Sequence, residues 1–289
     1  MRLVAGAYAA SDSYESAASC SAVDITDTRH GLFAALEWDT GEDFTHTAAL
    51  RWEDYSSHGE EFTWRLGSVW RIPGSSTSLR AGVGTAFRAP SYTDLFYQSI
   101  GFSGNPNLES QTSLGWELGV EQEFGETQRI QITAFRSLIE NTINSFASPS
   151  PVNIPGTTAT DGLELAWTGS INHPDLQYRL SWTHLHKSLD DQPRNAATAT
   201  LSWQATEDTM YGIGATHFSS RSYGANDIAA YTVFRLFASH QLTEKVRLHA
   251  RIENLLDEEY ELYLNQGGGF RDLKQGAGTG LYVGVTIDL

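Results

Sequence analysis

Apolar and polar residues alternate with a period of two along most of this chain. In segment 281–289, leucine, valine and isoleucine occupy every second position, with tyrosine, glycine, threonine and aspartate between them. Segments 114–121 and 246–253 repeat the pattern, with glycine and glutamate at the alternate positions of the first and arginine, histidine and glutamate at those of the second. Such alternation predicts β-strands that present one apolar and one polar face.

The pattern predicts fourteen strands, most of them 10–13 residues long. Ordinary strands have about 5–6 residues, whereas about 9–11 residues are needed to cross a bilayer obliquely. The lengths therefore favour strands that span a membrane. The expected strands lie at residues 2–9, 30–39, 43–55, 61–72, 76–88, 112–124, 128–140, 158–170, 176–187, 195–205, 209–221, 229–241, 245–255 and 277–289.

The connections between these strands alternate in length. Short turns such as "TGE", "PGS" and "TEK" stand opposite longer polar segments, with "SSHGE" as a short exception. Short turns on one side and long loops on the other are typical of outer-membrane barrels. We therefore expect an all-β fold, an antiparallel transmembrane β-barrel. The long loops are expected at 10–29, 89–111, 141–157, 188–194, 222–228 and 256–276.

Composition removes several other classes of protein. The formal net charge of −16 argues against a nucleic-acid partner, because phosphate binding needs clustered lysine and arginine. The sequence contains no run of about 18 apolar residues, which excludes a conventional transmembrane helix. It also contains no nucleophile elbow and no metalloprotease motif, which argues against an enzyme. The single cysteine, Cys20, falls in an expected external loop, where a lone cysteine suggests a partner elsewhere.

Four sequence blocks carry a family resemblance. The passage "GTAFRAPSYTDLF" (84–96) followed by "GNPNLESQTSLGWELGVE" (104–121) resembles the mid-barrel passage of TonB-dependent outer-membrane receptors. "DGLELAW", "RIENLLDEEYELY" and "GTGLYVGVTIDL" are similar to later strands of that family and follow in the same order. The spacing is most similar to that of the vitamin B12 (cobalamin) receptor branch. The resemblance covers essentially the whole chain.

The resemblance implies a larger assembly and a transport function. Barrels of this family have 22 strands and enclose a plug domain, through which the TonB complex acts. The resemblance thus identifies residues 1–289 as the C-terminal part of a receptor barrel, without the plug domain. It implies uptake of a bulky nutrient, cobalamin or a ferric siderophore, captured by extracellular loops. A passive fourteen-stranded pore is the alternative, and an outer-membrane hydrolase is a third, less favoured class.

Two sets of residues are candidates for function. Aromatic and amide side chains in the long loops could form the mouth of a ligand site, although ordinary loop packing and rim anchoring are the favoured interpretation for each single residue. Charged residues on the polar strand faces could contact a plug or simply line a wetted lumen. The loop set is Tyr92, Phe96, Tyr97, Phe102, Asn105, Tyr263, Gln266 and Phe270, and the lumen set is Arg65, Arg88, Glu117, Glu121, Glu164, Arg247 and Arg251.

Metal binding has only weak support in the sequence. His184 and His186 share one strand face, but an interfacial histidine pair is the favoured interpretation. Acidic residues of the first long loop could hold a structural calcium ion, yet they lack regular ligand spacing. We therefore expect no metal site and no cofactor. The loop acids are Asp12, Glu15, Asp24 and Asp27.

Overall fold

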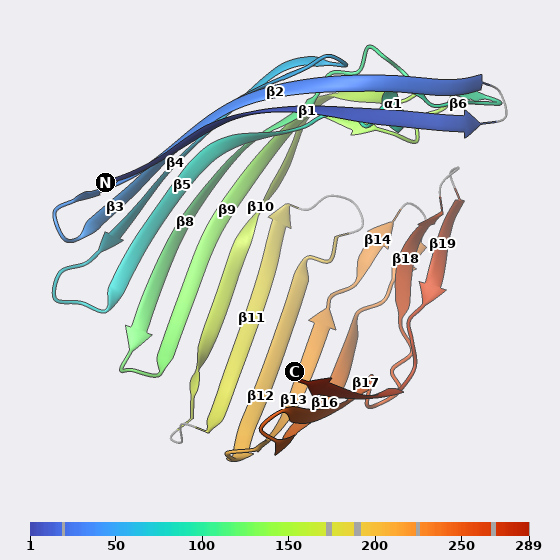
Figure 1. Ribbon diagram of the computed structural model, residues 1–289. Helices are drawn as coiled ribbons and strands as arrows, with labels where there is room; N and C mark the ends of the chain where they lie inside the picture. The colour runs from blue at the N-terminus through green and yellow to red at the C-terminus, as the bar shows by residue number, and fades with distance from the viewer. Residues whose placement is uncertain (19–20, 172–174, 188–191, 224–225, 267–269, 289) are drawn as a thin grey trace. The chain divides into compact units, whose positions relative to one another are not determined.

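The computed structural model describes residues 1–18, 21–171, 175–187, 192–223, 226–266 and 270–288 (Figure 1). Within them, fourteen antiparallel strands are hydrogen bonded in chain order into one sheet, which confirms the predicted all-β class and strand number. The strands are β1 (Arg2–Ala18), β2 (Ser21–Thr40), β3 (Phe44–Tyr55), β4 (Gly59–Arg71), β5 (Thr77–Arg88), β8 (Gln111–Phe124), β9 (Gln128–Asn144), β10 (Val152–Ser170), β11 (Leu176–Lys187), β12 (Asn195–Thr206), β13 (Thr209–Phe218), β16 (Tyr231–Thr243), β17 (Val246–Glu253) and β20 (Gly280–Ile287).

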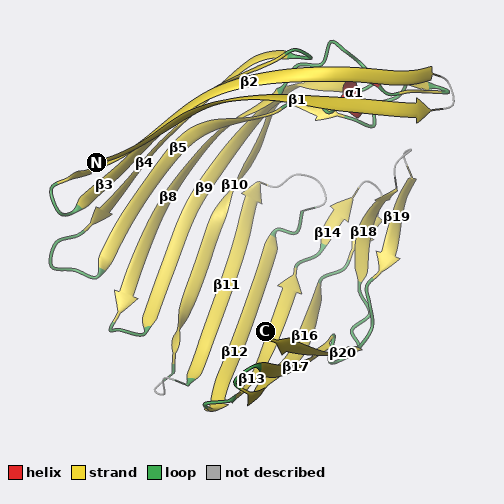
Figure 2. Ribbon diagram, viewed as in Figure 1, coloured by secondary structure: helices red, strands yellow, loops and turns green. Residues whose placement is uncertain are grey.

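The chain divides into two compact units, which we describe separately. Unit 1 consists mainly of Met1–Leu118 and Phe135–Thr160, and unit 2 of Gly119–Ala134, Asp161–Gln266 and Phe270–Leu289. Strands dominate both units (Figure 2). No helix in the described part of the chain is long and apolar enough to cross a membrane.

In unit 1, each strand presents an apolar and a polar face. Phe62 and Leu66 of β4 are 58% and 51% exposed and project from the apolar face. Arg65 and Arg71 of the same strand project from the opposite face, which we call the inner face. Residues directly opposite on neighbouring strands share a face, so Arg51 of β3, paired with Thr63, also lies on the inner face. No described element of the unit covers the apolar face.

The first hairpin is longer than its sequence suggests. Residues 10–29 were expected to form a loop, and this expectation was wrong: β1 and β2 remain paired from Arg2 with Glu37 to Ala18 with Ser21. The segment is polar, but period-two alternation continues through it, and Asp12 is paired with Asp27. A strand needs an apolar face only where it contacts lipid or a core. The polar half of this hairpin therefore extends the sheet beyond the apolar region.

The segment that follows β5 folds into a compact loop structure. β5 ends at Arg88, and the buried Pro90, which cannot donate to a ladder, follows it. Helix α1 (Tyr92–Phe96) then begins with a capping box between Ser91 and Asp94. The loop continues through β6 (Gln98–Ser99) and β7 (Phe102–Ser103). Its apolar centre consists of Leu95, Leu108 and Ile143, with Phe96 packed against them.

Unit 2 repeats the two-faced construction. Leu281 and Val283 of β20 are 70% and 73% exposed on the apolar face, whereas Tyr282 lies on the inner face opposite Arg251 of β17. Two segments expected as loops contain short hairpins instead. These hairpins are β14–β15 (Arg221–Tyr223 and Asn226–Ile228) and β18–β19 (Glu261–Gln266 and Phe270–Gln275).

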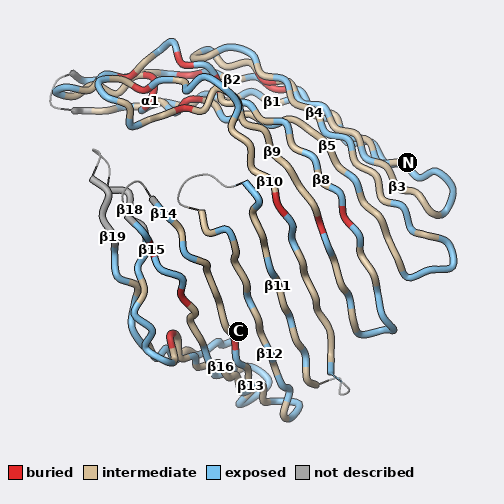
Figure 3. The backbone as a smooth tube through the Cα atoms, turned by 180° about the vertical axis from the view of Figure 1, so that it is seen from behind, coloured by how far each residue is buried: buried red, intermediate tan, exposed pale blue. Residues whose placement is uncertain are grey.

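Buried residues are few in the described chain (Figure 3). Only Leu95, Leu108, Ile143, Ile228 and Tyr231 form the buried hydrophobic set there. A water-soluble domain of this size would bury a much larger apolar core, since hydrophobic burial is the dominant favourable term in folding. The apolar side chains instead point outward in long rows, as lipid-facing strands require.

Candidate functional site

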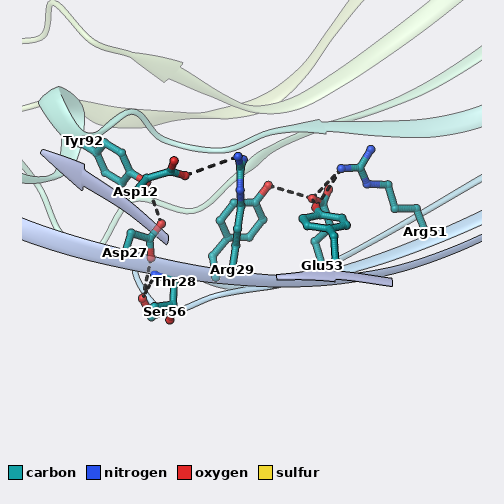
Figure 4. Close-up of polar contacts among 10 residues, drawn as sticks. Asp12, Asp27, Thr28, Arg29, Arg51, Glu53, Ser56 and Tyr92 are labelled. Atoms are coloured by element: carbon teal, nitrogen blue, oxygen red, sulfur yellow. Dashed lines mark hydrogen bonds and ion pairs between the residues drawn. The ribbon is translucent and has the colours of Figure 1, made fainter. Parts of the chain in front are cut away.

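A network of polar side chains joins α1 to the far ends of β1, β2 and β3 in unit 1 (Figure 4). We call this end of the strands, where the longer connections lie, the outer end. Asp27 is 3% exposed and accepts hydrogen bonds from Ser56 Oγ at 2.6 Å and from Tyr92 Oη at 3.1 Å. Ser56 Oγ also accepts from the Thr28 backbone N–H at 2.9 Å. The Asp27 carboxylate therefore fixes α1 against the hairpin.

A second buried carboxylate lies further along the same face. Glu53 of β3 is 3% exposed and receives a hydrogen bond from Arg51 Nη2 at 2.7 Å. The hydroxyls of Tyr8 and Tyr55 also donate to Glu53, and the Arg51 guanidinium lies 5.7 Å from the centre of the Tyr8 ring. Gly31 is directly opposite Tyr8, and the ring occupies the space that a Cβ there would need. Buried charge is thus paired and hydrogen bonded, as its desolvation requires.

Two groups of the loop after β5 have shifted pKa values. Burial and the adjacent Asp27 carboxylate raise the pKa of Tyr92 to about 12, which keeps its hydroxyl a donor. Burial alone would raise the pKa of the Asp94 carboxyl, but hydrogen bonds from Ser145 and Ser91 outweigh it. The pKa of Asp94 consequently lies below its ordinary value, and the carboxylate remains charged at neutral pH.

Five of the predicted mouth residues lie together in this loop. Tyr92 is held by Asp27, and its ring centre is 5.9 Å from that of Tyr14. The half-buried rings of Tyr97 and Phe102 lie 6.2 Å apart. Asn105 donates from Nδ2 to the Pro151 carbonyl at 3.0 Å, so it ties the loop to the start of β10. Phe96 belongs to the apolar centre of the loop.

The other three predicted mouth residues belong to the β18–β19 hairpin. Gln266 is paired with Phe270, and Tyr263 lies three pairs further along the hairpin, opposite Leu273. Their backbone is described, but their side chains lie outside the described part of the structure, so their role stays a prediction. Cys20 lies outside the described residues altogether.

The predicted charged row occupies the inner faces of both units. In unit 1, Arg65 and Glu117 form an ion pair at 3.3 Å beside a hollow of about 330 Å³. Arg88 lies close enough to Asp94 to help lower its pKa. In unit 2, Glu121 pairs with Arg129 at 3.6 Å. Ion pairing therefore partly neutralises the charges of the predicted residues Arg65, Glu117 and Glu121 on the inner faces.

The remaining members of the row lie on β10 and β17 in unit 2. Arg247 donates from Nε to Gln241 Oε1 at 2.7 Å. Arg251 pairs with Glu253 at 3.4 Å and lies 4.8 Å from the Tyr282 ring centre. Glu164 is exposed opposite Thr183 of β11. Every predicted lumen residue is therefore on the polar face, and contact of these residues with a plug stays a prediction.

Metal-binding chemistry is not assembled in the described residues: no three histidine, cysteine or acidic side chains there could hold an ion together. His184 bonds Asn195 Oδ1 through Nδ1 at 2.9 Å and stacks near Trp182. Asp12 is engaged by Arg29 at 3.5 Å, and Asp27 by hydroxyl groups. Of the side chains considered for metal binding, His184, Asp12 and Asp27 therefore have protein partners.

Sequence reasoning missed the network around Glu53. The inner face carries all three residues of this network, Tyr8 of β1 and Arg51 and Glu53 of β3. Nothing in the local sequence pattern shows that these side chains meet. Only the register between β1, β2 and β3 brings them together. The capping box at Ser91 and Asp94, in contrast, has a local signal, "SYTD", which matches the acidic form of that motif.

Comparisons with known proteins agree with this architecture. Residues 3–255 match the profile of the family described as TonB dependent receptor-like, beta-barrel. The chain is 31% identical over 239 residues to the vitamin B12 transporter BtuB of Vibrio vulnificus, with 78% of this chain and 38% of the transporter covered. It is 24% identical over 278 residues to an iron-regulated outer membrane virulence protein of Vibrio cholerae, covering 83% of this chain and 42% of that protein.

Solved structures show the same fold. A ferric enterobactin receptor, PfeA, from Pseudomonas aeruginosa in complex with enterobactin superposes with a TM-score of 0.83 at 19% identity, over 99% of this chain and 51% of that one. The siderophore receptor PirA from Pseudomonas aeruginosa gives a TM-score of 0.78 at 21% identity, over 99% and 51%. This chain spans about two fifths of the length of the curated relatives it matches. The family match and the named relatives together place the chain in the TonB-dependent receptor β-barrel family of the bacterial outer membrane.

Proposed function

We propose that this chain forms part of the barrel wall of a receptor that imports a bulky nutrient across the outer membrane. The expected ligand is cobalamin or a ferric siderophore, because relatives by sequence include a vitamin B12 transporter and an iron-regulated outer membrane protein. Uptake would further need a plug domain inside the barrel and the TonB complex acting on that plug. The chain itself would contribute the lipid-facing surface, the inner wall and part of the ligand mouth.

The observation that carries this proposal is the fixed loop after β5. Polar ties to Asp27 and Pro151, together with the apolar centre around Leu95, hold this loop at the outer end. The rings of Tyr97 and Phe102 are half-buried and so keep part of their surface free. A preorganised aromatic surface loses little conformational entropy when a large ligand binds.

Ligand binding to native outer membranes tests the proposal. Membranes containing the protein should bind labelled cyanocobalamin or a ferric catecholate in a saturable manner. Replacing both Tyr97 and Phe102 with alanine should weaken binding by at least about tenfold, since two aromatic contacts are lost. The matched control is Tyr211→Ala, which removes a half-exposed ring from the apolar face of β13. Absence of saturable binding of both ligands would contradict the receptor function.

Two further measurements separate this receptor from the passive pore. Uptake in cells lacking TonB should fall to the level of cells without the protein. An antibody against residues 256–276 should detect a native band near twice 31.8 kDa if the chain works together with a plug. Stable open channels from this chain in planar bilayers, with unchanged uptake in cells lacking TonB, would favour the pore instead.

A further inference from the structure

Two arginines on the inner face of unit 2 lie in one row across four neighbouring strands. Arg179 of β11 is paired with Thr200 of β12, and Thr200 is paired with Gly214 of β13. Gly214 is in turn paired with Arg235 of β16. These strands lie side by side (Figure 1). Residues directly paired across a sheet project from the same face, so both guanidinium groups stand on one side with only threonine and glycine between them.

Gly214 allows the two arginines to approach each other. A Cβ at this position would lie 2.7 Å from Arg235 Nε and 3.1 Å from its Cγ, so the Arg235 side chain lies across the glycine. That direction leads along the row toward Thr200 and Arg179. Neighbouring strands are about 4.8 Å apart, so three strand steps separate the two arginine backbones by about 14 Å. Two long side chains can contact the same ligand across that span.

Within the described part of the chain these two arginines have no acidic partner, unlike several other arginines of the inner wall. Arg65, Arg129 and Arg251 each form an ion pair with a glutamate. Among the described residues, no carboxylate forms an ion pair with Arg179 or Arg235. Glu253, on the strand beyond Arg235, is engaged by Arg251 at 3.4 Å. The row therefore retains two positive charges in a chain whose net charge is −16.

The surroundings of the row suit an oxyanion. Both arginines line one hollow of about 690 Å³ within unit 2. Among the described residues no acidic side chain lines this hollow, and its serine and threonine hydroxyl groups come from β10, β12, β13 and the turn before β9. Guanidinium groups bind phosphate and carboxylate oxygens through paired N–H donors, and hydroxyl groups can donate to further oxygens. The serine and threonine residues are Thr127, Thr168, Ser170, Thr198, Thr200, Ser202 and Thr216, and Tyr178 also lines the hollow.

We propose that the row formed by Arg179, Thr200, Gly214 and Arg235 is a binding site for an extended oxyanion, a phosphate-ester or polycarboxylate group carried by a solute in the lumen. The span between the arginines favours a ligand with two anionic ends over a single orthophosphate. The site deepens the proposed function and rests on it only for the transport of the bound solute. Binding itself needs no plug, no TonB complex and no capture by the outer loops.

Calorimetric titration of the 289-residue chain, folded in zwitterionic detergent micelles, tests the proposal. Pyrophosphate and citrate are the probes, with orthophosphate as the single-centre comparison. We expect saturable binding of at least one extended probe, more tightly than orthophosphate, and weakening as salt is raised. Arg179→Gln and Arg235→Gln should each reduce affinity about tenfold or more, because a charge-assisted contact is lost.

Two matched variants make the test specific. Arg251→Gln removes an inner-face arginine of the same unit that already has an acidic partner, and it should leave affinity unchanged. Gly214→Ala keeps both guanidinium groups but displaces Arg235, and it should weaken binding several-fold while the strand content by circular dichroism stays the same.

Equal losses in Arg251→Gln and Arg179→Gln would overturn the site, since binding would then follow total charge alone. Absence of saturable binding in the folded chain would also overturn it. Tighter binding of an oligoglutamate peptide than of either small probe would assign the row to an acidic protein segment and refute the solute site. Loss of cobalamin or siderophore binding with intact pyrophosphate binding would instead count against the proposed nutrient only.

Discussion

Removing one hydroxyl group from the loop after β5 should release that loop from the sheet. Tyr92→Phe deletes the hydrogen bond that the hydroxyl donates to Asp27 Oδ2 at 3.1 Å, and it leaves the ring and its contact with Tyr14 in place. Asp27 is 3% exposed, so water cannot easily replace the lost donor. The hydroxyl groups of Ser56 and Ser57 remain bonded to the carboxylate, but the donor that links it to α1 is gone.

The magnitude follows from the chemistry of this bond. A hydrogen bond to a charged group contributes about 1.5–3 kcal/mol, which corresponds to an increase of about 10- to 150-fold in the equilibrium for local opening. The effect should be confined to the loop, because the strand ladders on either side do not depend on Tyr92. Local opening of this kind is measured by amide hydrogen exchange.

Hydrogen exchange of the folded protein gives the test. The reporters are amides bonded within the loop: Leu95 to the Ser91 carbonyl at 3.0 Å, Tyr97 to Thr93 at 3.2 Å and Asn105 to Asp94 at 2.8 Å. They should exchange faster in Tyr92→Phe, while Tyr211→Phe on the apolar face of β13 serves as the control. Loop exchange that changes less than about threefold would refute the idea that Asp27 holds the loop, since that is below about 0.7 kcal/mol.

Further predictions concern the same loop and the two faces of the sheet. The pKa of Asp94 is lowered, so the stabilisation that Asp94 gives to α1 is complete at a pH above the ordinary aspartate pKa and is lost as the pH falls through the lowered pKa. Asp94→Asn should therefore remove the acid dependence of hydrogen exchange in the loop. Tyr92 has a raised pKa, so loop protection should decline as the pH rises from about 10 toward about 12. Leu95→Ala should destabilise the loop by about 2–5 kcal/mol and speed its proteolysis, whereas Ile100→Ala, at a site 87% exposed, should not. Leu118→Arg on the lipid-facing side of β8 should cost about 2–4 kcal/mol in refolding into lipid vesicles, and Ser113→Arg on the inner face should cost much less.

The strands and their two faces could be predicted because they depend on local pattern. Val283 and Leu281 alternate with Tyr282 and Gly284, and the structure places the first pair outward. The same logic failed at residues 10–29, where strand pairing continues without apolar residues. Polarity was interpreted there as a loop, although it only marks the point at which the hairpin leaves the apolar region.

The contacts that build the candidate site could not be predicted in this way. Tyr92 and Asp27 are 65 residues apart, and their hydrogen bond depends on the path of the whole intervening chain. The row from Arg179 to Arg235 depends on three successive strand registers. A slip of one residue in any of them would turn a whole strand to the other face, so composition and spacing alone cannot specify the row.

The two units make different use of charge on the same kind of polar face. At the outer end of unit 1, the buried carboxylates Asp27 and Glu53 each have several donors, and this satisfaction fixes α1 and the strand ends. In unit 2, Arg179 and Arg235 lie exposed and have no acidic partner among the described residues, so we expect their donors to be available to a ligand. A buried charge whose hydrogen bonds are all made within the protein holds its surroundings rigid. An exposed arginine without a protein partner can instead bind an anion, because its N–H donors give up only water when the anion binds. The pyrophosphate titration and the loop exchange in Tyr92→Phe would measure these two properties independently of each other.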